Sequence, residues 1–144
     1  MYVDALDARE AVYVCRFRQG PEADTDTDYA AHVANLSAAV KQTESNAQRL
    51  LVVIIQDPGY PAPNARWRKT IAEMTNADNF APAVAFVTAN PLIRGVLTAI
   101  AWLSKPKYEQ TMLSTVPEAL DWLERKRGGA VPRLRELARE VTAS

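Results

Sequence analysis

The residue types that carry most enzyme chemistry are scarce in this sequence. Cys15 is its only cysteine and His32 its only histidine. Nucleophilic catalysis by serine needs a histidine together with a recognisable nucleophile motif, and no Gly-x-Ser-x-Gly stretch is present. Metal sites are commonly built from clustered cysteines and histidines, which are also missing. We therefore expect a protein that is not an enzyme and that holds no metal.

Motifs that bind phosphate groups or calcium are missing as well. The five glycines form neither Gly-x-Gly-x-x-Gly nor a Walker-type loop, so no nucleotide cofactor is expected. Asp24, Asp26 and Asp28 resemble a calcium loop, but an EF-hand requires glycine at its sixth position and glutamate at its twelfth. Counted from Asp24, these positions hold Tyr29 and Asn35. We expect the three aspartates to cap the N-terminus of the helix that follows.

The lone histidine and the lone cysteine have structural interpretations. His32 lies four residues after Asp28 and one position off the apolar stripe of its helix, so we expect a His–Asp pair at the surface. Cys15 lies in an alternating strand pattern and is expected to be a buried thiol. A single cysteine allows no internal disulfide, as is typical of a reducing compartment.

Arginines near two helix starts are the remaining candidates for binding. The stretch DPGYPAPNARWRK follows an apolar strand, at the edge of the sheet where open α/β folds bind ligands. Its prolines make it stiff, Asn64 suits a helix cap, and Arg66 and Arg68 supply cationic donors. We expect Tyr60 and these three residues to contact a partner or ligand. The alternative is a solvated basic face beside a stiff connector.

The stretch TANPLIRG is the second candidate. Asn90 is expected to cap a helix and Pro91 to occupy its first position. Arg94 then lies in the first turn, where a cation is unfavourable without a partner. We expect Arg94 to pair with an acidic residue or to help bind an anion, and we include it among the candidate contact residues. Gly95 is expected to permit close contact between helix and sheet.

Strand and helix patterns alternate along the chain. Two strands at its start, Tyr2 to Leu6 and Ala11 to Arg18, are expected to pair antiparallel at a sheet edge. The uninterrupted apolar run Leu50 to Gln56 is typical of a central parallel strand. A more polar strand from Tyr108 to Leu113 suits an edge. The predicted fold is α/β, a mixed and mostly parallel sheet of about four to five strands with helices packed against it.

The end of the chain carries an extra element. A helix is expected to end at Gly128, and a short amphipathic helix follows it. The apolar side of this last helix is formed by Leu134, Leu137 and Val141. We divide the chain into a domain, residues 1–129, and a C-terminal helix, residues 130–144. That helix packs either on the domain or on a partner.

The charge balance excludes several classes of partner. The 17 Lys and Arg residues equal the 17 Asp and Glu residues, so no net field attracts nucleic acid or an anionic membrane. No apolar run reaches the roughly 18 to 20 residues that an integral membrane segment needs. The start MYVDALDARE lacks the apolar centre of a signal peptide. We expect a cytoplasmic protein.

Two long stretches resemble a known family. LLVVIIQDPGYPAPNARWRKTIAEM and AVAFVTANPLIRGVLTAIAWLSKPKYEQTMLSTVPEALDWL are similar to the SpoIIAA-like branch of the STAS superfamily (sulfate transporter and anti-sigma-factor antagonist). Bacterial proteins of this group are often labelled STAS/SEC14 domains. The resemblance covers Val12 to Leu123. It implies a sheet with helices against it that works as a protein-interaction or small-ligand module.

One regulatory feature of that family is not carried over. In its phosphorylation-regulated members a serine opens the helix after the second central strand, whereas the stretch GYPAPNARW holds no serine or threonine. We expect a non-enzymatic regulatory module with a protein partner, and a homodimer formed through the edge strand or the terminal helix is also open. The alternative is a domain that binds a small ligand, a lipid or a nucleotide.

Overall fold

The computed structural model describes the backbone of residues 1–104 and 108–144, and the side chains of 1–99 and 108–144. Its elements follow the predicted order of two strands, alternating helices and strands, and a terminal helix. They are β1 (Tyr2–Asp7), β2 (Val12–Phe17), α1 (Thr25–Thr43), β3 (Leu51–Gln56), α2 (Ala65–Thr75), β4 (Ala83–Val87), α3 (Pro91–Ser104), β5 (Glu109–Leu113), α4 (Val116–Arg127) and α5 (Pro132–Ala143).

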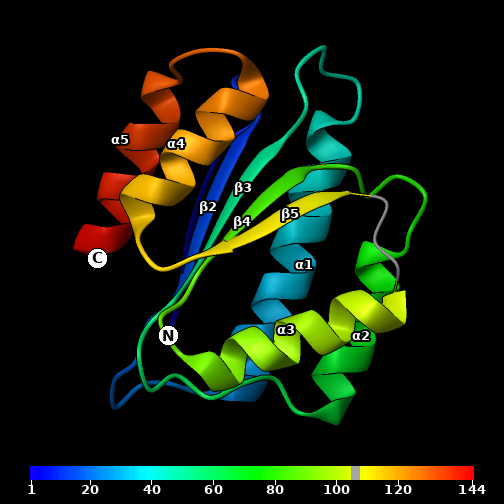
Figure 1. Cartoon of the computed structure of the whole chain (residues 1–144), viewed down its shortest axis with the longest axis vertical. Helices are drawn as coiled ribbons and strands as arrows, with labels where there is room; N and C mark the ends of the chain where they lie inside the picture. The colour runs from blue at the N-terminus through cyan, green and yellow to red at the C-terminus, as the bar shows by residue number, and fades with distance from the viewer. Residues whose placement is uncertain (105–107) are drawn as a thin grey trace.

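The strands form one mixed sheet in chain order, β1-β2-β3-β4-β5. β1 runs antiparallel to β2, with Tyr2 opposite Phe17, and the other neighbouring strands are parallel. Because crossover connections share one hand, the helices that join β2 to β3, β3 to β4 and β4 to β5 must lie on the same face. Figure 1 shows α1, α2 and α3 on that face, and α4 and α5 on the other. The predicted mixed, mostly parallel sheet with an antiparallel edge pair is confirmed.

Strand β2 divides its side chains between two cores. Tyr13, Cys15 and Phe17 face the helices α1 and α2, whereas Val12 and Val14 face α4 and α5. This is the alternation of an extended chain, in which successive side chains point to opposite faces. The central strand β3 contributes buried side chains to both cores, as its uninterrupted apolar run predicts.

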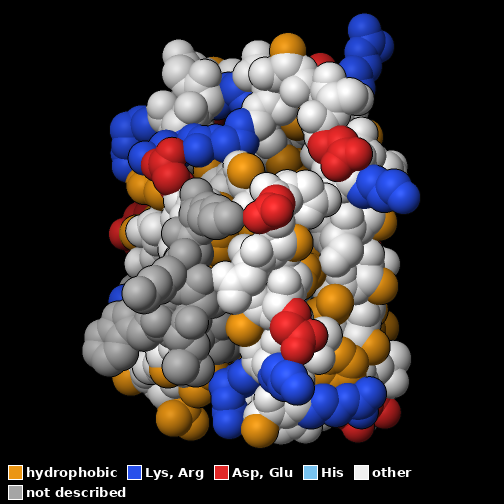
Figure 2. Space-filling model, turned by 90° about the vertical axis from the view of Figure 1, so that its right-hand side faces the viewer, with side chains coloured by type: hydrophobic (Ala, Val, Ile, Leu, Met, Phe, Trp, Pro, Cys, Tyr) orange, Lys and Arg blue, Asp and Glu red, His pale blue; other side chains and the backbone are white. Residues whose placement is uncertain are grey.

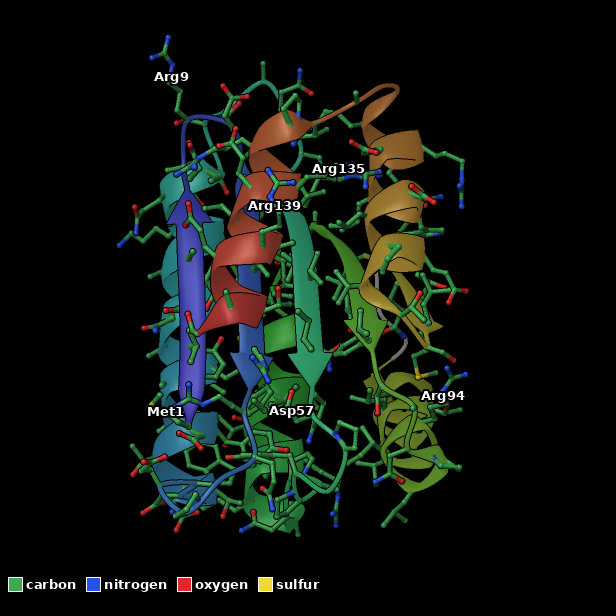
Figure 3. The ribbon with its side chains drawn as sticks, turned by 90° about the vertical axis from the view of Figure 1, so that its left-hand side faces the viewer. Met1, Arg9, Asp57, Arg94, Arg135 and Arg139 are labelled. Carbon is green, nitrogen blue, oxygen red and sulfur yellow. The ribbon has the colours of Figure 1, made fainter. Side chains whose placement is uncertain are left out.

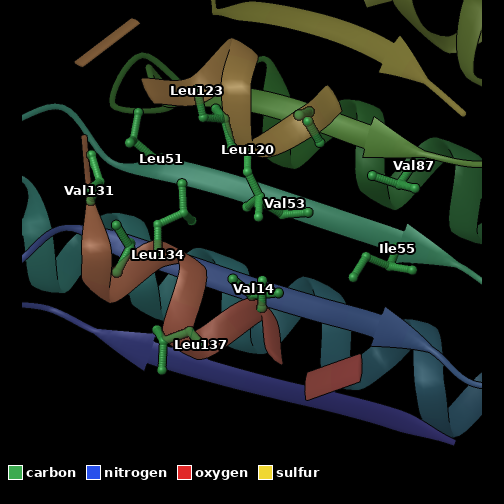
Figure 4. Close-up of a cluster of buried hydrophobic side chains, with 14 of the residues drawn as sticks. Val14, Leu51, Val53, Ile55, Val87, Leu120, Leu123, Val131, Leu134 and Leu137 are labelled. Carbon is green, nitrogen blue, oxygen red and sulfur yellow. The ribbon is translucent and has the colours of Figure 1, made fainter. Parts of the chain in front are cut away.

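The core beneath α4 and α5 combines side chains of the sheet and of both helices. Figure 4 draws Val14, Val53 and Val87 of the sheet together with Leu120 of α4 and Leu137 of α5, all of which are buried members of this core. Their burial removes apolar surface from water, which is the main favourable contribution to folding.

Helix α5 packs on the sheet of its own chain. Its apolar side, predicted from the sequence, lies against β1 and β2 and is almost completely buried. Several polar contacts also hold the helix in place. The Nη2 of Arg135 donates to Oε1 of Glu124 in α4 at 2.5 Å, and the Nη1 of Arg16 in β2 donates to the carbonyl oxygen of Thr142 at 3.0 Å.

The end of α4 also follows the prediction. Gly128 has a φ of 94°, and its N–H donates to the carbonyl of Glu124 at 2.9 Å. Only glycine adopts this left-handed conformation without steric cost, so the residue ends the helix and turns the chain toward α5. Over the part of the chain that the structure describes, no helix combines the length and the hydropathy that crossing a membrane requires.

Candidate functional site

The carboxyl ends of the parallel strands gather the residues that the sequence points to. Asp57 follows β3, and Arg94 lies in the first turn of α3 after β4. Figure 3 shows both residues at the end of the sheet where these strands terminate, with Met1 nearby and Arg9 at the opposite end. Ligands and partners of open α/β sheets commonly meet the protein at this edge.

The turn between β3 and α2 is held rigidly at its start. The Nε and Nη2 of Arg16 donate to the two carboxylate oxygens of Asp57 at 2.8 and 3.0 Å, and the backbone N–H of Gln19 donates to Oδ2 at 3.1 Å. Gly59 follows with a φ of 84°, a conformation that glycine adopts at no steric cost. The loop that joins β2 to α1 and the turn after β3 are therefore fixed to each other.

Tyr60 anchors the turn from inside the protein. Its side chain is 1 % exposed, and its hydroxyl donates to the carboxylate of Asp28 at the start of α1. The other oxygen of Asp28 accepts from the backbone N–H of Tyr2 at 3.0 Å. Asp28 thus joins three segments instead of capping its helix, and only Asp24 caps it, by accepting from the N–H of Thr27 at 3.1 Å. Tyr60 lies outside the surface available to a partner.

The start of α2 presents two cations on a supported base. Asn64 caps the helix as predicted, since its Oδ1 accepts from the N–H of Trp67 at 3.1 Å. Trp67 is buried and donates from its indole nitrogen to Asp26 at 2.9 Å. The guanidinium of Arg66 lies 4.8 Å from the centre of the Trp67 ring, and that of Arg68 donates to the carbonyl of Pro63 at 3.0 Å. Both arginines are exposed, and neither forms an ion pair with an acidic residue in the described part of the chain.

Arg94 contacts neutral groups, and among the described residues it forms no ion pair with the acidic partner that was one of the two expectations. Its part in binding an anion stays a prediction. Its Nε donates to the carbonyl oxygen of Thr88 at 3.2 Å, and its Nη2 donates to Oγ of Ser114 at 2.8 Å. These bonds connect the ends of β4 and β5. The adjacent cap is as predicted, because the Oδ1 of Asn90 accepts from the N–H of Leu92 at 2.9 Å.

Gly95 was expected to permit close contact between the helix and the sheet, and the structure shows that it does not. It lies on the exposed side of α3, and a Cβ added to it would meet no atom within 4 Å. The reason is its position around the helix axis: among the described side chains of α3, Ile93 is buried and Leu97 partly buried on one face, and Gly95 points away from that face.

His32 is buried, which corrects the prediction of a surface His–Asp pair. Its side chain is 4 % exposed, and its Nδ1 lies 3.0 Å from the hydroxyl oxygen of Tyr2 and 3.8 Å from the Sγ of Cys15. Asp28, the predicted partner, points instead to Tyr60. His32 lies three residues after Tyr29, a spacing that belongs to the same helix face, and this spacing was the sequence signal for its burial.

The fold thus brings the only cysteine beside the only histidine, but the pair is not activated. Burial raises the pKa of the Cys15 thiol to about 12 and lowers the pKa of His32 to about 4. At neutral pH the thiol is protonated and the imidazole is uncharged, so no thiolate–imidazolium pair forms. Cys15 is also completely buried, so a substrate could not reach it. The prediction of a buried thiol is confirmed.

A cavity that sequence analysis did not predict lies between the sheet and the helices α1, α2 and α3. Its volume is about 40 Å³. The lining combines aromatic and aliphatic side chains with a few neutral polar ones, and those with polar atoms are Tyr29, His32, Gln56, Thr75, Tyr108 and Gln110. The two glutamines were the available sequence signal, since each interrupts or ends a strand that is otherwise apolar on this face.

The chain matches no protein-family model, no curated protein and no solved structure. Within the described residues, no group of three or more His, Cys, Asp and Glu side chains is arranged to hold a metal ion. The site is therefore described by two features of the fold itself: the cationic start of α2 at the carboxyl edge of the sheet, and the neutral cavity beneath α2 and α3.

Proposed function

We propose that this protein is a non-enzymatic interaction module of the STAS-like kind, which binds an acidic segment of a partner protein at the start of α2. The observation that carries the proposal is the pair of exposed guanidinium groups of Arg66 and Arg68. Neither guanidinium forms an ion pair with a described acidic residue, so both are available to a partner. Arginine side chains suit carboxylates because their planar donors match two oxygens at once.

The base beneath these arginines supports the same proposal. Asn64 fixes the first turn of α2, and Trp67 lies buried under the guanidinium of Arg66. A surface that is rigid before binding loses little conformational entropy when a partner arrives. Figure 2, which faces the right-hand side of Figure 1, shows blue side chains gathered at the lower end of this face, where α2 begins. The resemblance to STAS domains, which implies interaction at the corresponding turn, agrees with this placement.

The test is capture of a partner by the full chain and by a charge-reversed variant. The double variant Arg66→Glu/Arg68→Glu should lose the captured partner, whereas the matched variant Arg9→Glu/Arg139→Glu should retain it. Both variants change the net charge equally, and Arg9 and Arg139 are exposed and lie away from the carboxyl edge (Figure 3). Binding should also weaken as salt is raised. Equal recovery of the partner by both variants would show that the start of α2 is not the contact surface.

A further inference from the structure

A chain of hydrogen bonds with a single direction leads to the cavity. The carboxylate of Asp4 can only accept, and it accepts from the hydroxyl of Tyr13 at 2.7 Å. The oxygen of Tyr13 therefore accepts from the hydroxyl of Tyr2, 2.7 Å away. Since the proton of Tyr2 is used in that bond, its oxygen must accept from the Nδ1 of His32 at 3.0 Å. The direction of the chain thus places the proton of the neutral imidazole on Nδ1.

This assignment leaves the Nε2 of His32 as a bare acceptor. No hydrogen bond joins Nε2 to any residue that the structure describes. Every fully enclosed side-chain nitrogen and oxygen of the described residues has a partner, so an unpartnered Nε2 must keep some accessible surface. His32 itself is more than nine-tenths buried and lines the cavity. A donor bound in the cavity would give this acceptor a hydrogen-bond partner inside the protein.

The rest of the lining limits what that donor can belong to. No Asp, Glu, Lys or Arg side chain lines the cavity. A charged group such as a phosphate would lose its hydration there without a compensating partner, which excludes a nucleotide or an anionic headgroup inside. Aromatic rings surround the space, among them Phe17, Phe80 and Phe86. Such walls favour a flat, neutral ring.

Among the described residues, the wall on the side of α2 and α3 is partly exposed. Ile71 and Met74 of α2, Phe86 of β4 and Leu97 of α3 all line the cavity and are only partly buried. The present volume of about 40 Å³ has room for only one or two water molecules. Entry of a ring requires these side chains to move apart, and the flexible thioether of Met74 can do so at low cost.

We propose that the cavity beneath α2 and α3 binds a small neutral aromatic molecule with a hydroxyl group, a ligand of the phenol class. The ring lies among the aromatic and aliphatic side chains, and the hydroxyl donates its proton to the Nε2 of His32. No charge on the ligand takes part. This site is separate from the cationic start of α2, so the variant Arg66→Glu/Arg68→Glu should bind the ligand as the unchanged chain does.

The experiment compares phenol with toluene, which has nearly the same shape but no donor. The full chain is titrated with each compound while backbone amide resonances are recorded by NMR. We expect saturable shifts centred on Ile54, Phe86 and neighbouring cavity residues, and a dissociation constant for phenol about five- to tenfold lower than for toluene, the effect of one neutral hydrogen bond. Equal affinities, shifts centred elsewhere or the absence of saturable binding would overturn the proposal.

Two variants locate the effect. His32→Leu replaces the imidazole with an apolar side chain of similar size and so removes the acceptor. The preference for phenol over toluene should then disappear. Leu97→Trp adds bulk from the partly exposed wall and should abolish binding of both compounds, with circular dichroism confirming the fold. The phenol-to-toluene ratio is measured on the unchanged chain, so it decides the proposal even where His32→Leu does not fold. Retained binding in the folded Leu97→Trp variant would exclude the cavity.

Discussion

His32 illustrates how one buried side chain changes the response of the whole protein to acid. Its imidazole lies between α1 and the sheet, with Tyr2 and Cys15 at its Nδ1 and the ring of Phe17 5.1 Å away. The carboxylate of Asp4 does not contact the imidazole, because the hydroxyls of Tyr2 and Tyr13 lie between them in the hydrogen-bond chain. It therefore does little to favour the charged imidazolium. Burial therefore dominates and lowers the pKa of His32 to about 4.

This lowered pKa predicts a loss of stability in mild acid. In the unfolded chain His32 titrates near its ordinary pKa of 6.5, so between pH 6.5 and 4 the unfolded state binds more protons than the folded state. The free energy of unfolding should fall across this window, by about 3 kcal/mol for a shift of this size. The stabilisation is present above pH 6.5 and is lost as the pH falls.

Denaturant unfolding of the unchanged chain and of His32→Gln at several pH values checks this. The variant should be the less stable protein at pH 7, and the difference between the two should shrink as the pH approaches 4. Carboxylates such as Asp7 and Glu124, whose pKa values are lowered by hydrogen bonds and ion pairs, titrate equally in both proteins and cancel from the difference. Parallel curves for the two proteins would contradict the assignment.

At the scale of the elements, α3 exposes an apolar side chain near its start. The helix is apolar around most of its circumference, yet Leu92 is 69 % exposed and Gly95 also faces outward. A helix that is apolar all round is normally enclosed. Its N-terminal cap at Asn90 and the bonds from Arg94 to Thr88 and Ser114 hold its start. These contacts position the partly exposed wall of the cavity.

Two glycine substitutions should have opposite effects for reasons of backbone conformation. Gly95→Ala should stabilise the protein by about 0.5 to 1 kcal/mol, because alanine suits a helix interior and the new methyl group meets no atom within 4 Å. Gly128→Ala should destabilise it by about 1 kcal/mol, because its φ of 94° is unfavourable for a residue with a Cβ. Thermal unfolding of both variants gives the signs, and a destabilised Gly95→Ala would show that this face of α3 is covered by another surface.

At the scale of the whole molecule, the two faces of the sheet differ in what they enclose. The face under α4 and α5 is an apolar core that joins the last helix to the first strands. The face under α1, α2 and α3 has an apolar core of its own and also contains the hydrogen-bond chain and the cavity. The proposed ligand site therefore lies on the opposite side of the sheet from α4 and α5.

Loss of packing in the core under α4 and α5 should affect the whole protein. Leu137→Ala removes a fully buried side chain of α5 and should lower the free energy of unfolding by about 2 to 5 kcal/mol. The control Leu92→Ala truncates the same residue type at an exposed position and should change it by less than about 0.5 kcal/mol. Denaturant titrations of both variants measure the difference. A small effect at Leu137 would mean that α5 is dispensable for the domain.

The sequence by itself determined the order of elements, the strand pairing at the first edge and the ends of the helices. These features depend on local chemistry: the alternation in β2, the uninterrupted apolar run of β3, the caps Asn64 and Asn90, and Gly128. Each is decided by a residue and its near neighbours along the chain.

Only the tertiary structure decided which side chains meet. His32 is buried because β1, β2 and α1 close around it, and Tyr60 is an anchor because Asp28 lies within reach across 32 residues of sequence. Arg94 contacts neutral oxygens at two neighbouring strand ends, and the cavity lies where side chains of the sheet meet those of α1, α2 and α3. Burial and hydrogen-bond partners depend on contacts between distant segments, which the periodicity of a single element does not contain.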